Sequence, residues 1–318
     1  MAANINPGVS NEPNQTQGQT DVLSILNAKL KSSGDPDLAV LHEPEETQGE
    51  ADIIRTFTAA LESSHDPATV AAKLADDLRQ FFISSESRAD ADGLLWDLWM
   101  VFLSAVWLVP VDHPWHAALV AVIETLHSTG GPVVEFEGST LDWAKLPNLN
   151  EYLFDKWNDP TELEDYSSED VDAWKRLNSF MSRLLKDEFP RWMVLPYWEI
   201  SKALETTPQE RVVFECYLWV ATQWLTKCAH LLRRNMALTE GLDEEAQEAI
   251  PTGLLCKGVP PRSLERWNFW RSRLAELASA EPPAGNDGAE KPVPSEREAS
   301  SLRIAQAIAA MDAATNSA

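Results

Sequence analysis

The chain has 318 residues, 44% of them hydrophobic, a length that allows one large domain or two small ones with a buried core. Its 50 acidic residues outnumber its 26 basic residues, and the net charge of −24 at pH 7 repels nucleic-acid phosphates and anionic membrane surfaces. The 13 tryptophans indicate helices that pack through large side chains.

The N-terminal region is polar. Residues 1–20 are rich in Asn, Gln, Pro and Gly, which predicts a disordered tail, and residues 21–49 are read as a short helix and an acidic linker. A basic segment followed by an apolar one is missing here, so a signal peptide is not expected. The three cysteines, an odd number for a disulfide framework, favour a reducing compartment. We therefore expect an intracellular protein, cytoplasmic or nuclear and not secreted.

Residues 50–279 are predicted to form one all-α domain, a compact multi-helix array with a tryptophan-rich core. Each main helix follows a capping residue, and several have proline at the first helical position. These helices are expected at 67–84, 114–128, 168–188, 208–235 and 264–279, with caps at Asp66, Asp112 or His113, Ser167, Thr207 and Ser263. Capping boxes are expected for Ser167 with Asp170 and for Thr207 with Glu210. Inside the helices apolar residues recur at helical spacing, as at Trp115, Leu119, Val122 and Leu126.

Residues 94–111 form an almost continuous apolar run whose length approaches that of a membrane-spanning helix. Asp97 and the closing Pro110 interrupt the run, so we expect the buried central helix of an α-protein and no membrane insertion. Residues 132–136 look locally extended and are expected to form a loop or an edge. The acidic stretch 158–172 is the best candidate for an internal loop or boundary.

The C-terminal region changes composition twice. Residues 280–299 are rich in Pro, Gly and charge, which predicts a disordered linker. Residues 300–318 predict a short Ala-rich helix or tail, with one side formed by Leu302, Ala305, Ile308 and Met311. This segment is expected either to dock on the core or to bind a partner.

Several Glu and His residues have the spacing of metal ligands. The pairs are Glu62 with His65, Glu124 with His127, and His113 with His116, and Glu199 and Glu215 could complete a di-iron set. The first two pairs fall at predicted helix ends, whereas di-iron proteins use such pairs in the middle of helices. His116 and His127 are eleven positions apart, roughly 16 Å along one helix, which is too far for a shared zinc. We therefore expect no metal and no cofactor.

The cysteines Cys216, Cys228 and Cys256 have no neighbouring signature of a cysteine hydrolase, and we expect them to behave as small core residues. A nucleophile elbow, a phosphate-binding glycine loop and a dinucleotide fingerprint are also missing. An enzyme whose site is assembled from scattered helices stays open.

Five polar residues occur on apolar faces and are candidates for a pocket or for buried polar groups: Asp97, His116, Asn178, Glu199 and Arg266. Burying such a group costs a few kcal/mol unless it is paired. We expect internal pairing, such as an indole N–H donating to Asp97 or an arginine–carboxylate pair tying two helices, with a tryptophan-lined ligand pocket as the alternative. The expected structural core contains Trp99, Trp115, Trp174, Trp224, Trp267 and Trp270.

Four strings in the second half of the chain carry a resemblance to a known family. They are Trp174-x-x-Leu177-Asn178-Ser179-Phe180-Met181-x-Arg183-Leu184, Lys202-Ala203-Leu204-Glu205, Ala221-x-x-Trp224, and Ser263-Leu264-Glu265-Arg266-Trp267-Asn268-Phe269-Trp270-x-x-Arg273. With them, residues 85–278 resemble the fungal family known as domain of unknown function 3632. The resemblance implies a fungal, helical, intracellular protein, and it implies no activity, cofactor or substrate. In the segment 263–277, Leu264, Trp267, Trp270 or Arg271, Leu274 and Leu277 are expected on one helix face.

Three functions remain after these tests. The leading interpretation is a non-enzymatic interaction or scaffold module with a protein partner. The alternative is a small-molecule binding protein or enzyme with a tryptophan-lined pocket between helices. The third is a chromatin-associated regulator, although nucleic-acid binding is not expected from the charge. It would need a basic face made from Lys227, Arg233, Arg234, Lys257, Arg262, Arg266, Arg271 and Arg273.

Overall fold

The computed structural model describes residues 48–64, 66–84, 91–131, 134–136, 139–207, 210–238, 241–279 and 294–317. This part of the chain is helical apart from one short hairpin, which confirms the predicted all-α class and the tryptophan-rich core. It divides into two compact units: unit 1 is Met1–Val109 with Ala121–Phe154, and unit 2 is Pro110–Val120 with Asp155–Ala318.

The domain boundaries expected from the sequence stay a prediction. The region expected as one domain, 50–279, contributes residues to both compact units. The expected tail at 1–20, the segment 21–47 and residues 280–293 of the expected linker lie outside the described residues.

Unit 1 is a small helical assembly in which α2 packs on α3 and α4. Its elements are α2 (Gln48–Glu62), α3 (Pro67–Ser84), α4 (Ala91–Leu108), the second part of α5 (Pro114–Thr129), β1 (Val134–Phe136), β2 (Ser139–Leu141), η2 (Trp143–Lys145) and α6 (Leu149–Asp155). Helix α3 begins as expected, because Asp66 Oδ2 accepts the N–H of Thr69 at 2.9 Å. Helix α5 ends where Gly130 takes φ +60° and its N–H donates to Leu126 O at 3.1 Å.

Helix α4 is apolar nearly all round and is the buried helix that the sequence predicts. Trp99 is fully buried, and its indole N–H donates to Pro147 O at 2.7 Å instead of to Asp97, which lies half-buried on the same helix. Within the described ranges, no helix has both the length and the apolar character needed to cross a membrane. The segment expected as a loop or an edge forms β1, which pairs antiparallel with β2 in the register Glu135 to Thr140.

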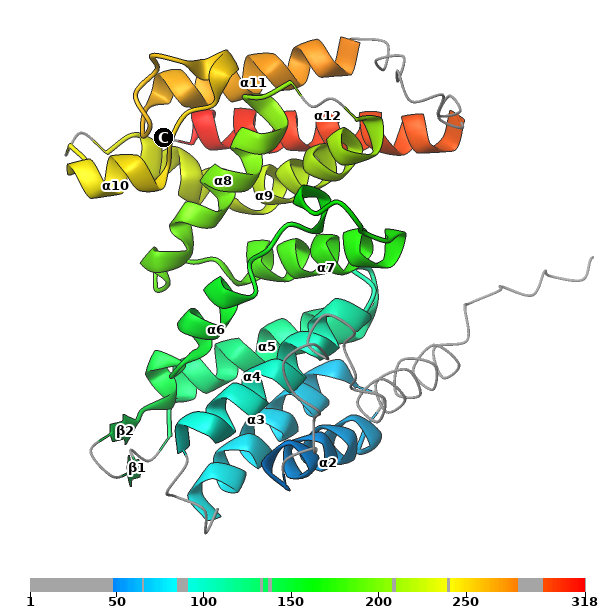
Figure 1. Ribbon diagram of the computed structural model, residues 1–318, viewed down its shortest axis with the longest axis vertical. Helices are drawn as coiled ribbons and strands as arrows, with labels where there is room; N and C mark the ends of the chain where they lie inside the picture. The colour runs from blue at the N-terminus through cyan, green and yellow to red at the C-terminus, as the bar shows by residue number, and fades with distance from the viewer. Residues whose placement is uncertain are drawn as a thin grey trace, which may run out of the picture. The chain divides into compact units, whose positions relative to one another are not determined.

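Unit 2 is organised around α9 (Arg211–Met236), which packs against α7, α8, α11 and α12. Its other elements are the first part of α5, η3 (Pro160–Glu162), α7 (Ser168–Leu184), η4 (Pro190–Met193), α8 (Val194–Leu204), α10 (Glu244–Ala249), η5 (Leu254–Cys256), α11 (Leu264–Ser279) and α12 (Pro294–Asn316). Figure 1 shows α12, in red, lying beside α9 and α11.

Among α7, α9 and α11, two helix starts agree with the expected caps and one does not. Ser167 and Asp170 form the predicted capping box of α7, although α7 ends at Leu184 rather than 188. Ser263 Oγ accepts the N–H of Arg266 at 3.1 Å and caps α11. The capping box expected for Thr207 with Glu210 is wrong, since α9 begins at Arg211. Glu210 is itself the N-cap, in an extended conformation (φ −110°, ψ 139°) that cannot belong to a helix.

Two predicted helix faces need correction. In α12 the buried residues are Ile304, Ala307, Met311 and Ala314, whereas Leu302 is 60% exposed. The expected face placed residues at steps of three, which drift around a helix of 3.6 residues per turn, while the observed 3-4-3 spacing keeps to one side. In α11, Leu264 is 37% exposed and Arg266 is fully buried in its place.

Candidate functional site

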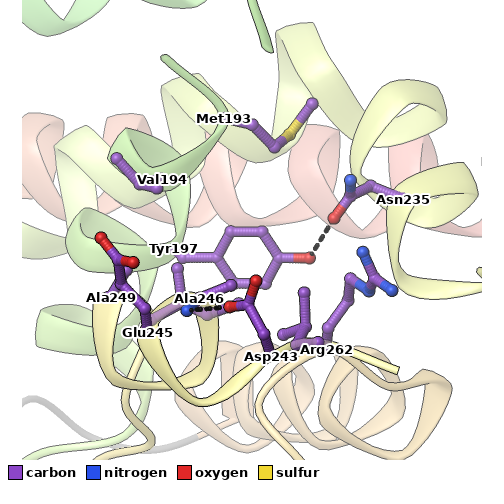
Figure 2. Close-up of a pocket in the computed structure, with 11 residues that line it drawn as sticks. Met193, Val194, Tyr197, Asn235, Asp243, Glu245, Ala246, Ala249 and Arg262 are labelled. Atoms are coloured by element: carbon purple, nitrogen blue, oxygen red, sulfur yellow. Dashed lines mark hydrogen bonds between the residues drawn. The ribbon is translucent and has the colours of Figure 1, made fainter. Parts of the chain in front are cut away.

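An open pocket of about 360 Å³ lies in unit 2 between α8, α9 and α10. Its walls include the apolar side chains Met193, Val194, Leu242 and Ile250. In Figure 2 the ring of Tyr197 lies at the centre of the pocket, with Met193 and Val194 on one side of it and Asp243 and Arg262 on the other. The volume falls near the lower end of the range for ligand sites, about 300–1,000 Å³.

The polar groups of the pocket are held by hydrogen bonds. Tyr197 donates its hydroxyl to Asn235 Oδ1 at 2.8 Å, and burial raises the pKa of Tyr197, so the phenol stays protonated as a donor. Asp243 Oδ1 accepts the N–H of Ala246 at 2.8 Å and caps α10. Glu245 and Arg262 complete the polar lining, which therefore contains two carboxylates and one guanidinium. The pocket therefore has apolar walls and slightly acidic polar residues.

Close to Tyr197, a buried ion pair fixes the end of α8 to α11. Arg266 Nε donates to Glu205 Oε1 at 2.6 Å, and neither side chain is exposed. The remaining four guanidinium hydrogens reach Glu205 Oε2 and the carbonyls of Ile250, Pro251 and Pro261. The guanidinium also lies over the rings of Tyr197 and Trp270, at 5.4 and 5.3 Å from their centroids. All five donors of this arginine are used, so the group is a structural clamp.

Glu205 is satisfied equally fully. Its Oε1 accepts the indole N–H of Trp270 at 2.6 Å, and its Oε2 accepts the backbone N–H of Gly253 at 2.6 Å. Gly253 is required at that position, because an added Cβ would lie 2.6 Å from Glu205 O. The backbone of Glu205 also accepts the N–H of Leu255 at 2.9 Å. This clamp, Glu205 with Arg266, Trp270 and Gly253, holds the chain before α11 against α8.

A second, partly buried cluster surrounds Lys202 on the same helix. Lys202 Nζ lies 2.8 Å from Glu162, 2.9 Å from Asp159 and 3.8 Å from Glu199. Burial alone would lower the pKa of Lys202, but the carboxylates of Glu199 and Asp159 reverse this and raise it. The amine therefore stays charged, with three carboxylates sharing one cation.

Glu199 is the carboxylate of this cluster whose negative charge is least compensated. It is 2% exposed, and burial raises its pKa to about 7, with Lys202 opposing that effect. Glu199 Oε1 accepts the indole N–H of Trp157 at 3.1 Å. Lys202 lies closer to the other two carboxylates, and protonation of Glu199 reduces the excess negative charge of the cluster without removing it.

Tryptophans line the same region. Trp157 lies edge-on to Trp174 at 5.0 Å, and Lys202 lies 5.9 Å from the ring centre of Trp174. Asn178 links α7 to α9. Its Oδ1 accepts the indole N–H of Trp224 on α9 at 2.9 Å, and its Nδ2 donates to Trp174 O on α7 at 3.0 Å. The buried indole N–H of Trp174 has no hydrogen-bond partner in the described part of the chain.

His116 is fully buried against α7. Its Nε2 lies 3.2 Å from Arg176 O and acts as the donor, which leaves Nδ1 as a buried acceptor without a partner among the described residues. Burial, with a smaller contribution from the charges of Arg183 and Arg176, lowers the pKa of His116 to about 4. The imidazole is therefore neutral near pH 7.

The structure brings some sequence candidates together and separates others. His116, Asn178, Glu199 and Arg266 are all buried in unit 2, whereas Asp97 is half-buried in unit 1. The 11 residues that line the pocket include none of these five. The six tryptophans expected in the core are each buried, at 0–5% exposure: Trp99, Trp115, Trp174, Trp224, Trp267 and Trp270.

Sequence reasoning missed the residues that contact these candidates or their partners: Trp157, Asp159, Tyr197, Lys202 and Glu205. One signal was present, because Lys202 and Glu205 stand at the two ends of one of the strings that carry the family resemblance. A polar residue at each end of an otherwise apolar string indicates that both polar residues are paired, but it does not identify their partners.

The metal-like pairs have other roles or fall outside the description. In the described ranges no three His, Cys, Asp or Glu side chains are grouped to hold a metal ion, and His65 lies outside those ranges. His113 Nδ1 accepts the N–H of Trp115 at 3.2 Å, and His127 Nδ1 lies 2.6 Å from Ala144 O. The three cysteines are buried and free, and burial raises the pKa of each thiol, to about 12 for Cys216.

In the described part of the chain, the fold and the site define an all-α protein with a tryptophan-rich core, buried and partly buried polar clusters, and an open pocket at Tyr197. A family model with the description "Protein of unknown function (DUF3632)" matches residues 99–274, and the chain belongs to this family. The four resemblance strings lie inside the matched residues, while α12 lies beyond them. No curated protein and no solved structure matches the chain.

Proposed function

We propose that this chain is a non-enzymatic interaction module whose pocket at Tyr197 receives an apolar side chain of a partner protein. The observation that carries the proposal is the open pocket of about 360 Å³, apolar in most of its lining and built on elements fixed by the Glu205–Arg266 clamp. The proposed setting is a fungal cell, in the cytoplasm or the nucleus.

The size of the pocket supports a side chain as its occupant. At about 30 Å³ for each liquid water, 360 Å³ equals roughly a dozen water molecules, which is small for a dinucleotide or another large cofactor. The pocket lining has an excess of negative charge, because it contains the carboxylates of Asp243 and Glu245 and the single guanidinium of Arg262. This excess favours a partner segment whose apolar residue is flanked by a basic one. The net charge of −24 favours the same partner.

A pair of exposed leucines beside the clamp supports a protein partner. Leu254 is 83% exposed and Leu255 is 41% exposed, although both residues follow Gly253 in a tightly bonded turn. A rigid turn that presents large apolar side chains to solvent is typical of a protein contact. Ile250, four positions before Leu254, lines the pocket.

The alternative, a small-molecule binding protein or enzyme, has one specific observation in its favour. Glu199, with a pKa raised to about 7 by burial, and the unpartnered indole of Trp174 both border Lys202. A ligand with a hydrogen-bond acceptor would satisfy Trp174. We rank this second, because Lys202 is already engaged by Asp159 and Glu162.

The chromatin-associated alternative loses much of the basic face that it needs. Four of the eight cations named for that face pair with carboxylates: Arg234 with Asp187, Arg266 with Glu205, Arg271 with Asp312, and Arg273 with Glu276. Neutralised guanidinium groups contribute little to phosphate binding.

Native mass spectrometry of the protein purified gently from its own source tests the proposal. Three forms are compared: the wild type, Ala246→Trp, which fills the pocket, and Gln247→Trp, which adds the same side chain at the exposed neighbouring position. We expect a protein partner on the wild type and on Gln247→Trp, and its loss from Ala246→Trp. Partner binding that survives in Ala246→Trp contradicts the pocket assignment. A bound small molecule, lost only in Ala246→Trp, replaces the proposal with the alternative.

A further inference from the structure

The pocket at Tyr197 has walls that are fixed by contacts within the chain. Trp198 of α8 donates its indole N–H to Ala249 O at 2.6 Å, which ties α10 to α8. Arg266 Nη1 donates to Ile250 O at 2.9 Å and holds the next residue of the same wall. Because little ordering is left for the moment of binding, the pocket selects its occupant by the groups that it already presents.

One of these groups is the side-chain amide of Asn235, which is half-buried near the C-terminal end of α9. Its Oδ1 accepts the hydroxyl hydrogen of Tyr197 at 2.8 Å. Reversing the amide would turn Nδ2 toward the phenol oxygen and leave the buried hydroxyl hydrogen without this acceptor, which is unfavourable. The contact with Tyr197 therefore fixes which end of the amide faces which way.

The amide nitrogen of Asn235 is the unused end of this pair. Figure 2 shows it on the side of the amide away from the hydroxyl of Tyr197. An amide nitrogen carries two N–H donors, and here neither has a hydrogen-bond partner among the residues that the structure describes. The pocket thus places two oriented donors beside the apolar side chains of Met193 and Val194. An occupant that complements both has a hydrogen-bond acceptor next to its apolar group.

The charge of the lining narrows the choice of acceptor. Asp243 and Glu245 outnumber Arg262, so an anionic acceptor is repelled and a neutral carbonyl is favoured. In a partner protein the nearest neutral acceptor to any apolar side chain is the backbone carbonyl. Within a helix these carbonyls are already bonded, except in the last turn, whereas an extended segment leaves them free.

We propose that Asn235 is a specificity-determining residue of the pocket, and that the partner segment binds in an extended conformation. The backbone carbonyl next to its buried apolar side chain accepts a hydrogen bond from Asn235 Nδ2. This inference rests on the function proposed for the pocket, and it adds the conformation of the partner segment and the residue that recognises it.

The test uses the full chain and the peptide acetyl-Lys-Leu-Lys-amide, which is too short to form a stable helix. Binding is followed by NMR through the backbone amide signals of Val194 and Ala246 in isotope-labelled protein. Asn235→Asp keeps an acceptor for Tyr197 but removes both donors, and its added negative charge by itself attracts the basic peptide. We nevertheless expect the dissociation constant to rise by about fivefold or more, as for the loss of one hydrogen bond. Asn268→Asp adds the same charge at an exposed position and should bind like the wild type.

Modified peptides test the same contact on the wild-type chain, whether or not Asn235→Asp folds. Each of the two amide bonds that flank the leucine is replaced in turn by an E-alkene, which keeps the shape and removes the carbonyl oxygen. One replacement should weaken binding to the wild type by a similar factor and leave binding to Asn235→Asp unchanged.

The outcomes separate this inference from the function on which it rests. Equal or tighter binding of the peptide to Asn235→Asp overturns the inference, as do two alkene peptides that bind the wild type like the parent peptide. If Ala246→Trp abolishes binding in those cases, the pocket assignment stands without the role of Asn235. A peptide that shifts no pocket signal at millimolar concentration also overturns the inference, whereas the proposed function is judged by the partner found in native mass spectrometry.

Discussion

Helix α8 and its C-cap carry two buried carboxylates, Glu199 and Glu205, whose surroundings differ. Glu205 meets a guanidinium, an indole N–H and a backbone N–H, each within 2.6 Å of one of its oxygens. Glu199 meets one indole N–H and shares the more distant Lys202 with Asp159 and Glu162. Both side chains are at most 2% exposed, so burial alone does not distinguish a structural carboxylate from a responsive one.

The difference lies in how completely the partners compensate each charge. The clamp at Glu205 has one anion for one cation and uses all five donors of Arg266. The Lys202 cluster has three anions for one cation, and the least compensated of them has its pKa raised to about 7. The first arrangement stabilises one structure, and the second can gain or lose a proton near neutral pH.

The largest effect is expected from breaking the clamp. Arg266→Met leaves Glu205 buried without its cation and should lower the free energy of unfolding by about 3–5 kcal/mol. Arg266→Lys should recover little of this, since an ammonium cannot make the same five contacts. Urea denaturation measures both. Arg271→Met, which breaks the exposed pair with Asp312, is the control and should cost less than about 1 kcal/mol. Equal losses for Arg266→Met and Arg271→Met would contradict the clamp.

The second prediction concerns pH and separates Glu199 from His116. The raised pKa of Glu199 makes the folded state lose stability as pH rises from about 4.5 to about 7. The lowered pKa of His116 makes it lose stability as pH falls from about 6.5 to about 4. Each shift of about 2.5 units corresponds to about 3 kcal/mol, and the two largely cancel between pH 4.5 and 6.5.

Single variants expose the two opposing contributions. In Glu199→Gln the free energy of unfolding should rise with pH across this window, and in His116→Gln it should fall. Guanidinium titrations at pH 4.5, 5.5 and 6.5 measure the slopes. If Glu199→Gln keeps the profile of the wild type, Glu199 is ionised throughout the window and the contrast with Glu205 disappears.

The smallest of the three effects tests the close backbone contact within the clamp. Gly253→Ala places a Cβ 2.6 Å from Glu205 O and should cost about 1–3 kcal/mol through overpacking. Gly241→Ala meets nothing within 4 Å and should change the free energy of unfolding by less than about 0.5 kcal/mol. Differential scanning calorimetry compares their melting temperatures. If Gly253→Ala had the same melting temperature as Gly241→Ala, the turn would be able to move away from α8.

The sequence predicted the helical framework well, because its signals are local. Caps such as Asp66, Ser167 and Ser263 act within three residues, and the spacing of Trp115, Leu119, Val122 and Leu126 follows one helix. The face of α12 was wrong because a run rich in alanine offers several similar stripes, and only the neighbouring helices decide between them.

The sequence predicted the type of polar pairing but not the partners. An arginine–carboxylate pair tying two helices was expected, and Arg266 was named, but its partner Glu205 is 61 positions away. Spacing in the sequence carries no information on such a pair, since the path of η5 and the turn before α11 brings the two together. The pocket at Tyr197 was missed for the same reason, because its lining comes from α8, α9, α10 and the loop before α11.

The separation of 61 positions between Glu205 and Arg266 also has a consequence during synthesis. At about 5–20 residues per second, Glu205 is made roughly 3–12 s before the arginine that neutralises it. For that interval the carboxylate at the end of α8 has been made without the guanidinium that pairs with it in the folded chain. The clamp therefore closes only after α11 has been translated.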